Sequence, residues 1–128
     1  MIGDIVLVPF PNSDLTDGKL RPALVLYEDA VEKEITIAYI SSKIPIILSP
    51  CEVLVTRGTH SFEESGLMMN SVIKLNKISS IKSYLIVGLL GSADEAMQTE
   101  VNIAIDMCLK IRRPNRDTPK GSPRDITE

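Results

Sequence analysis

Two short apolar runs, separated by a polar loop and a single arginine, constrain this chain more than any other feature of its sequence. Residues 2–8 are rich in β-branched side chains and stop at Pro9, which cannot donate to a strand ladder. The second run covers residues 22–27, with Arg21 immediately before it. Because Pro22 pushes the preceding residue toward an extended conformation, the guanidinium of Arg21 has a defined direction. A guanidinium held in this way suits a phosphate or carboxylate ligand.

The chain up to residue 90 is typical of further short strands joined by turns. A single helical turn is expected over 62–66, closed by Gly66. Turn signals are a loop over 12–19 and a charged turn over 28–33. Alternating or β-branched apolar residues predict strands over 34–40, over 51–56 and within 67–77, with a buried strand over 84–90.

The last third of the chain predicts one helix and a tail. Ser92 and Glu95 have the spacing of a capping box, in which each side chain bonds the backbone N–H of the other residue. Apolar residues then recur at helical spacing, which predicts an amphipathic helix to about Lys110. Residues 112–128 are rich in Pro, Arg and Asp and predict a disordered basic tail. We therefore expect one mainly β domain over residues 1–111, followed by that tail.

The charge of the chain limits the kinds of partner that it can have. The net charge is −3, and the tail holds five cations and three anions, so residues 1–111 carry −5. This balance argues against strong nonspecific binding to nucleic acid, and any RNA site must gather its few cations locally. No run of 18 apolar residues and no basic leader is present, so we expect neither a membrane span nor a secretory signal.

The cysteines and the histidine predict no metal site. Cys51 and Cys108 fall in different predicted elements, and His60 is the one histidine. Because no cluster of metal ligands forms around them, we expect no zinc and no cofactor. Two ordinary thiols in a reducing, cytoplasmic compartment are the expectation. His60 lies in a predicted turn, where a surface position is expected and a catalytic one is not.

Five segments together resemble the MazF/PemK-like toxins, the endoribonuclease partners in toxin–antitoxin pairs. The resemblance covers about residues 1–111 and implies a mainly β fold with added α, an SH3-like barrel (MazF/PemK/CcdB-like) with a C-terminal helix. The segments are Gly-Asp-Ile-Val at 3–6, Arg-Pro-Ala-Leu-Val-Leu at 21–26, Ile-Ala-Tyr-Ile-Ser-Ser at 37–42, Gly-Leu at 66–67 with Asn-Ser-Val-Ile at 70–73, and Ile-Val-Gly-Leu-Leu at 86–90.

The resemblance implies a catalytic pair. Arg21 matches the family's catalytic arginine, which stabilises the charge of the pentacoordinate phosphorus, and Ser41 matches a Thr or Ser that assists it. The adjacent Ser42 leaves the register open by one residue. Because successive strand residues point to opposite faces, only one of the two serines can share the face of Arg21. We place Ser41 in the catalytic position and Ser42 among the substrate-binding residues.

Four further residues are expected to contact substrate. Lys19 and Lys43 flank the predicted site, where each would neutralise a phosphate. Asn70 and Ser71 match the family's substrate-contacting pair. The chain departs from the family at residues 79–82, where Ser-Ser-Ile-Lys replaces a segment that carries Arg or Asp in many members.

The activity implied is that of a metal-independent endoribonuclease that cuts single-stranded RNA such as mRNA. Its products would be a 2′,3′-cyclic phosphate and a 5′-hydroxyl. The resemblance also implies a cytoplasmic homodimer with RNA in a groove at its interface, and a cognate acidic antitoxin that occupies this groove. Two alternatives stay open: a toxin of the same fold that binds a protein target, as gyrase inhibitors do, and a catalytically weak SH3-like binding domain.

Overall fold

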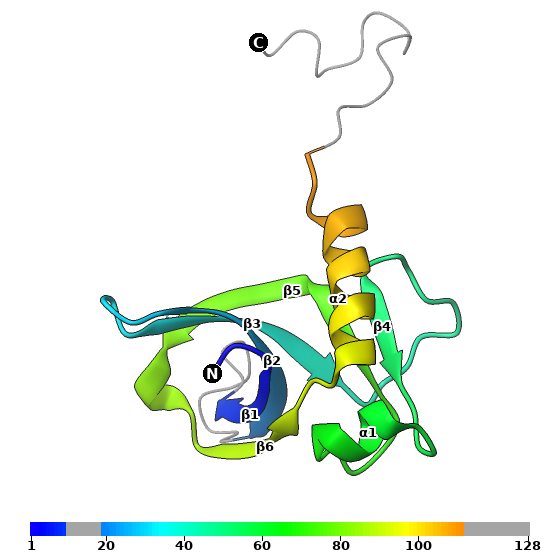
Figure 1. The fold of residues 1–128 in the computed structure, drawn as a ribbon, viewed down its shortest axis with the longest axis horizontal. Coiled ribbons are helices and arrows are strands. Elements are labelled where there is room, and N and C mark those ends of the chain that lie inside the picture. Colours follow the sequence, from blue (N-terminus) through cyan, green and yellow to red (C-terminus); the bar gives the residue numbers. More distant parts are fainter. Residues whose placement is uncertain (10–18, 112–128) are drawn as a thin grey trace, which may run out of the picture.

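Six antiparallel strands form one strongly curved sheet with a helix along one face (Figure 1). The computed structural model describes residues 1–9 and 19–111, so the predicted tail and most of the predicted 12–19 loop lie outside the described residues. The expected mainly β, barrel-like fold with a C-terminal helix is confirmed, and the curled sheet forms a half-barrel. Across the sheet the strands run in the order β4 (Glu52–Val55), β5 (Ser71–Lys82), β3 (Glu34–Ser41), β2 (Leu20–Asp29), β1 (Asp4–Pro9) and β6 (Gly88–Ser92).

The tip of the β2–β3 hairpin is built by one carboxylate. Asp29 accepts hydrogen bonds from the backbone N–H groups of Val31 (3.0 Å) and Glu32 (3.1 Å). Lys33 then closes the turn with a left-handed backbone at φ 55°. Such a turn is favoured because the aspartate side chain replaces a backbone acceptor. The charged turn predicted over 28–33 is therefore confirmed, with its first two residues still in β2.

One face of the sheet packs against helix α2 (Glu95–Cys108). The helix buries Met97, Val101 and Ala104 on this face, and the residues they meet come from all the central strands. Figure 1 shows α2 standing beside β4, with the short helix α1 (His60–Ser65) near its N-terminal end. This face holds the larger core, with Ile5, Leu24, Ala38, Ile40, Val53, Val55, Ile73 and Leu75 as its buried strand residues.

The opposite face carries a second, smaller core. Because strand residues alternate between faces, the residues next to those of the first core pack here. The sheet curls far enough for Ile81 and Ile86 to cover this cluster from its side. Its buried members are Val6, Val8, Ala23, Val25, Ile35, Ile37 and Tyr39.

Helix α2 begins two residues later than the capping-box spacing predicts. Asp94, not Ser92, is the N-cap, and its Oδ1 accepts the backbone N–H of Met97 at 2.9 Å. Ser92 is instead the last residue of β6, paired with Asp4. The carboxylate of Asp94 also accepts the hydroxyl of Ser61 (2.6 Å), so tertiary contacts from α1 select this cap. The sequence pattern could not contain that contact.

Of the buried strand expected over 84–90, only residues 88–90 are in a strand, and that strand is not buried. Residues Ser83–Leu85 form one 3-10 turn, and β6 starts only at Gly88. The strand lies at the edge of the sheet, where Leu89 is 67% exposed, and Val87 just before it is 60% exposed. An apolar run alone does not distinguish a central from an edge position, because that depends on which strands pair on each side.

The expectation of two ordinary thiols is also wrong, because Cys51 and Cys108 form a disulfide. Cys51 immediately precedes β4 and Cys108 is the last residue of α2, and their Cα atoms lie 5.3 Å apart. The two residues are 57 positions apart, so no local pattern signals this contact. Only the placement of α2 beside β4 brings the two side chains together.

Candidate functional site

Arg21 and Ser41 lie at neighbouring strand ends on the same face of the sheet. In the β2–β3 ladder Ala23 pairs with Tyr39, and continuing this register by two residues sets Arg21 opposite Ser41. Directly paired residues in antiparallel strands share a face. The face is that of the smaller core, because Arg21 also pairs with the buried Val8 of β1.

The surface beside this pair is apolar. Ser41 pairs with Val72 of β5, which in turn pairs with Leu54 of β4. Val72 is fully buried, whereas Leu54 is 40% exposed. The side chains of Ser41, Val72 and Leu54 thus form a row across the sheet beside Arg21. The Arg21 side chain is exposed and Ser41 is half-buried.

The hydroxyl of Ser41 has a fixed role as acceptor. Its Oγ accepts the backbone N–H of Lys43 at 3.0 Å. A serine hydroxyl still has its own proton to donate after accepting such a bond. The bond turns the chain sharply after β3, so Ser42 lies outside the strand and is exposed. The geometry therefore favours Ser41 over Ser42 as the partner of Arg21, and the assignment stays a prediction.

The next row of the same face contains ionisable groups. Lys74 pairs with Tyr39 on one side and with Glu52 on the other. The Lys74 ammonium and the Glu52 carboxylate form an ion pair, with side chains only 17% and 7% exposed. The hydrogen bond from Lys74, followed by that from the Ser49 backbone (2.9 Å), lowers the pKa of Glu52. Burial raises the pKa of Tyr39, and a hydrogen bond with Ser79 partly offsets this.

Sequence reasoning missed this pair, although a signal was present. Lys74 interrupts the apolar run Val-Ile-Lys-Leu at 72–75, and Glu52 precedes the apolar β4 run. A charge inside a predicted strand requires a partner when it is buried. The identity of that partner depends on strand pairing, so the sequence indicated that Lys74 needs a partner but not that the partner is Glu52.

The two predicted lysines are exposed at the edges of this site. Lys19 immediately precedes β2, and Lys43 follows the turn after β3. Both therefore flank the ends of the strands that carry Arg21 and Ser41. Neither makes a side-chain contact that fixes it among the residues described, so each is placed to follow a flexible anionic ligand.

Ser71 faces away from Arg21, and Asn70 is held at the end of the segment before β5. The Asn70 Oδ1 accepts the backbone N–H of Arg57 at 2.8 Å, which ties together the ends of the segment between β4 and β5. Ser71 is 3% exposed, pairs with Val55 on the face toward α2, and donates its hydroxyl to the Met69 carbonyl at 2.7 Å. Alternation explains the position of Ser71, since Val72 occupies the Arg21 face. Contact of either residue with substrate stays a prediction.

His60 belongs to a cap, not to the arginine site. It is 76% exposed, and its Nδ1 lies 2.9 Å from Oδ2 of Asp94. That hydrogen bond raises the pKa of His60. The Ser61 hydroxyl, followed by His60, lowers the pKa of Asp94 to about 2. This carboxylate therefore joins the start of α2 to α1.

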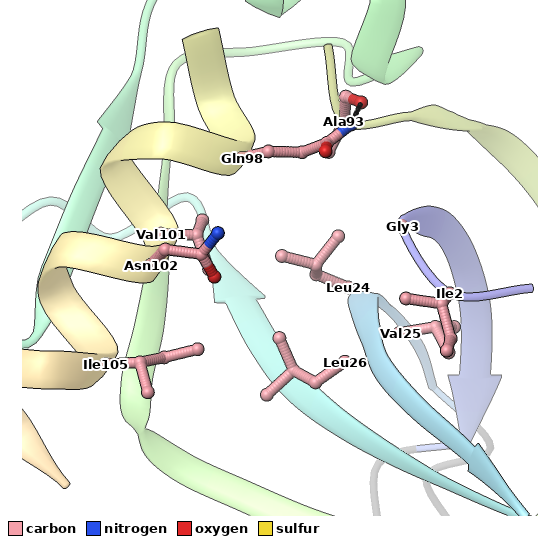
Figure 2. A pocket seen from close by; sticks show the side chains of 10 residues that line it. All are labelled: Ile2, Gly3, Leu24, Val25, Leu26, Ala93, Gln98, Val101, Asn102 and Ile105. Carbon is pink, nitrogen blue, oxygen red and sulfur yellow. Dashed lines mark hydrogen bonds between the residues drawn. The ribbon is translucent and has the colours of Figure 1, made fainter. Parts of the chain in front are cut away.

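Two pockets flank α2, and neither contains Arg21 or Ser41. Figure 2 shows the first, a cavity of about 210 Å³ between α2 and the sheet, where Leu24, Leu26, Val101 and Ile105 point inward. Gln98 closes one side by donating to the Ala93 carbonyl at 2.9 Å. The second, about 270 Å³, lies beside β4 and includes His60 and Asp94.

Comparison with known proteins assigns the family. The sequence matches the PemK-like, MazF-like toxins of type II toxin–antitoxin systems over residues 2–109. The chain belongs to this family. No curated protein matches the sequence significantly.

Solved structures of MazF-type toxins share the fold. Mycobacterium tuberculosis toxin MazF-mt6 has a TM-score of 0.65 at 18% identity, covering 86% of this chain and 99% of that one. MazF from Deinococcus radiodurans has a TM-score of 0.63 at 22% identity, covering 85% and 94%. An endoribonuclease from a mycobacterial species, in complex with its cognate antitoxin, has a TM-score of 0.64 at 15% identity, covering 89% and 98%.

The departure from the family pattern at residues 79–82 can now be placed. Ser79 pairs with Ile37, and Ser80 pairs with Thr36. The hydroxyl oxygens of Ser80 and Thr36 lie 3.4 Å apart. Their partners Ile37 and Thr36 lie further along β3 from Ser41 than Tyr39 does, so this segment is remote from Arg21.

Among the described residues no three His, Cys, Asp or Glu side chains gather as a metal site would require. The described helices are also too short or too polar to cross a membrane.

Proposed function

We propose that this toxin is an endoribonuclease that cuts single-stranded RNA without a metal. The observation that carries the proposal is the placement of Arg21 and Ser41 on one face at adjacent strand ends, in a chain of the MazF-like family. An exposed guanidinium beside an oriented hydroxyl supplies charge stabilisation and a proton donor. RNA carries its own nucleophile, the 2′-hydroxyl, next to each phosphorus.

The reaction follows from these groups. The 2′-hydroxyl loses its proton to water and attacks the adjacent phosphorus in line, and the bond to the 5′-oxygen breaks as that oxygen takes a proton from water. The products are a 2′,3′-cyclic phosphate and a 5′-hydroxyl. The Arg21 guanidinium forms two parallel hydrogen bonds to the equatorial oxygens as their charge grows. Ser41 donates to a non-bridging oxygen, while its own oxygen accepts from Lys43. Lys19, Lys43 and Ser42 contact the flanking nucleotides.

The proposal extends to partners and location. The mycobacterial endoribonuclease of similar fold was solved with its cognate antitoxin. We infer an acidic antitoxin segment that competes with RNA for Arg21 and Lys19, because carboxylates and phosphates use the same donors. We also infer a homodimer with RNA at its interface, acting in the cytoplasm where its substrate is found.

One gel tests the central claim. A defined transcript is incubated in EDTA with wild type, Arg21→Ala, Arg21→Lys and the surface control Lys110→Ala. Wild type and the control should cut equally, and Arg21→Ala should lose about 100-fold in rate. Arg21→Lys keeps the charge and loses the two-pronged geometry, so it should fall between them. Equal cutting by Arg21→Ala, or loss of all cutting in EDTA, would disprove the mechanism.

The rival function, binding of a protein target, has one observation in its favour. The outer side of α2 exposes Ile103 (59%) and Met107 (51%), and Ile111 (94%) follows the end of the helix. No aromatic residue stands among them to anchor such an interface. If folded wild-type protein cuts no RNA under any condition but still arrests growth, this alternative is favoured.

A further inference from the structure

The disulfide joins the end of the β3–β4 loop to the end of α2, and both segments have few buried side chains. Ala104 is the last buried residue of α2, and Leu109, directly after Cys108, is half exposed. The β3–β4 loop, residues 42–50, ends at Cys51, and its Ile46 and Ile47 are 102% and 83% exposed. The bond between Cys51 and Cys108 therefore ties the last turn of the helix to the end of this loop.

The same loop starts at the candidate site. Its first residues are Ser42 and Lys43, and the backbone of Lys43 bonds the Ser41 hydroxyl at 3.0 Å. At its other end, the backbone N–H of Cys51 donates to the Ser49 hydroxyl (3.2 Å), and the Cys51 carbonyl accepts from the backbone N–H of Leu75 (2.8 Å). The loop is thus a strap with one end beside Arg21 and the other on the disulfide.

Whether this disulfide persists depends on the compartment in which the chain acts. On the proposed function the substrate is cellular RNA, which lies in a reducing compartment. Disulfides that form in such a compartment are usually transient and sense redox state. Both cysteines are partly exposed, so a small thiol or disulfide can reach them.

We propose that the Cys51–Cys108 pair is a redox switch that sets the RNA affinity of the Arg21 site through the β3–β4 loop. This rests on the proposed function. Oxidation by a small disulfide forms the S–S bond between Cys51 and Cys108. The small disulfide takes up the two electrons and two protons and becomes two thiols. A dithiol reverses the step and becomes a disulfide itself.

The two states should differ in substrate binding more than in chemistry. Arg21 and Ser41 lie in paired strands and keep their positions when the bond opens. Ser42 and Lys43 lie in the strap, which samples more conformations once it is cut loose from α2. We therefore expect the KM of the reduced form to be higher by about two- to fivefold, the amount an exposed charge contact contributes, with kcat nearly unchanged.

The test compares the full chain oxidised by oxidised glutathione with the same protein reduced by dithiothreitol. Initial rates are measured on a defined transcript, and hydrogen exchange is followed over residues 42–50. The double variant Cys51→Ser/Cys108→Ser is the control, since it should behave as the reduced form and ignore dithiothreitol. Thiol titration should find no free thiol in the oxidised protein and two in the reduced protein.

Two results would overturn the switch: two free thiols after oxidation, or equal KM and equal loop exchange in both states. If no RNA is cut in either state, the proposed function fails, and loop exchange still decides whether the redox step reaches the site. If the serine variant fails to fold, reduced wild type supplies the comparison.

Discussion

Glu52 and Lys74 face each other across the β4–β5 ladder and form a shielded ion pair on the face that carries Arg21. Glu52 also accepts the backbone N–H of Ser49 in the β3–β4 loop. One carboxylate thus connects an edge strand, a central strand and the loop that leads away from the candidate site. The pair supports the structure of that face, so we expect its loss to lower the free energy of unfolding.

Replacing one partner should cost more than replacing both. Lys74→Met leaves the Glu52 carboxylate shielded without its cation, and we expect a loss of about 3 kcal/mol in the free energy of unfolding. The double variant Glu52→Leu/Lys74→Met should recover most of that loss, because no buried charge remains. Urea denaturation of Lys74→Met, Glu52→Leu and the double variant measures the coupling. Additive losses would show that the two groups do not interact.

Ser41→Ala should slow RNA cleavage more than Ser42→Ala does. Ser41 shares the face and the strand-end row of Arg21, whereas Ser42 lies outside the strand. Losing a hydrogen bond made to the developing charge costs on the order of 100-fold in kcat, and losing a ground-state contact raises KM instead. Single-turnover rates separate these effects. The reverse order of the two serines would move the functional position by one residue.

Reduction should lower the stability of the folded chain. The disulfide closes a loop of 57 positions, and the chain-entropy relation gives about 4 kcal/mol for such a loop. We expect the melting temperature to fall by on the order of 10 °C in dithiothreitol. The variant Cys51→Ser/Cys108→Ser should melt at the lower temperature with or without the reductant. Identical melting of oxidised and reduced wild type would mean that the bond does not constrain the unfolded chain.

The Asp94 cap should make stability depend on acid pH. Its pKa is lowered to about 2, so the folded state binds this proton less readily than the unfolded chain does. The stability from this group is therefore fully present above about pH 4 and is lost as the pH falls toward 2. Asp94→Asn keeps a capping oxygen but cannot titrate, so its unfolding free energy should change less over this range. Equal pH slopes for the two proteins would assign the acid sensitivity elsewhere.

Gly66 should not tolerate a side chain. It ends α1 with φ 72°, and a Cβ there would overlap the carbonyl of Leu90. We expect Gly66→Ala to destabilise the fold by about 2 kcal/mol or more, from backbone strain and displacement of β6 together. Gly58 is the matched control, since its φ is 89° but a Cβ would meet nothing within 4 Å. A similar loss for Gly58→Ala would show that the backbone conformation alone sets the cost.

Local chemistry in the sequence determined the strands, the turns and the resemblance that led to the site. Alternating apolar residues identified β3 and β4, Gly66 marked the end of α1, and Pro22 fixed an extended Arg21 at the start of β2. These signals depend on residues a few positions apart, and sterics and alternation act at that range. The family segments were readable for the same reason, because each is a short run in order.

Tertiary structure decided everything that depends on which strands are neighbours. The β2–β3 register set Ser41 toward Arg21, and alternation in β5 turned Ser71 away from it. Contacts from α1 moved the cap of α2 to Asp94, and the position of α2 beside β4 joined Cys51 to Cys108. Each of these outcomes rests on side chains that are distant along the chain. Their meeting follows from how the curved sheet closes, which no local pattern contains.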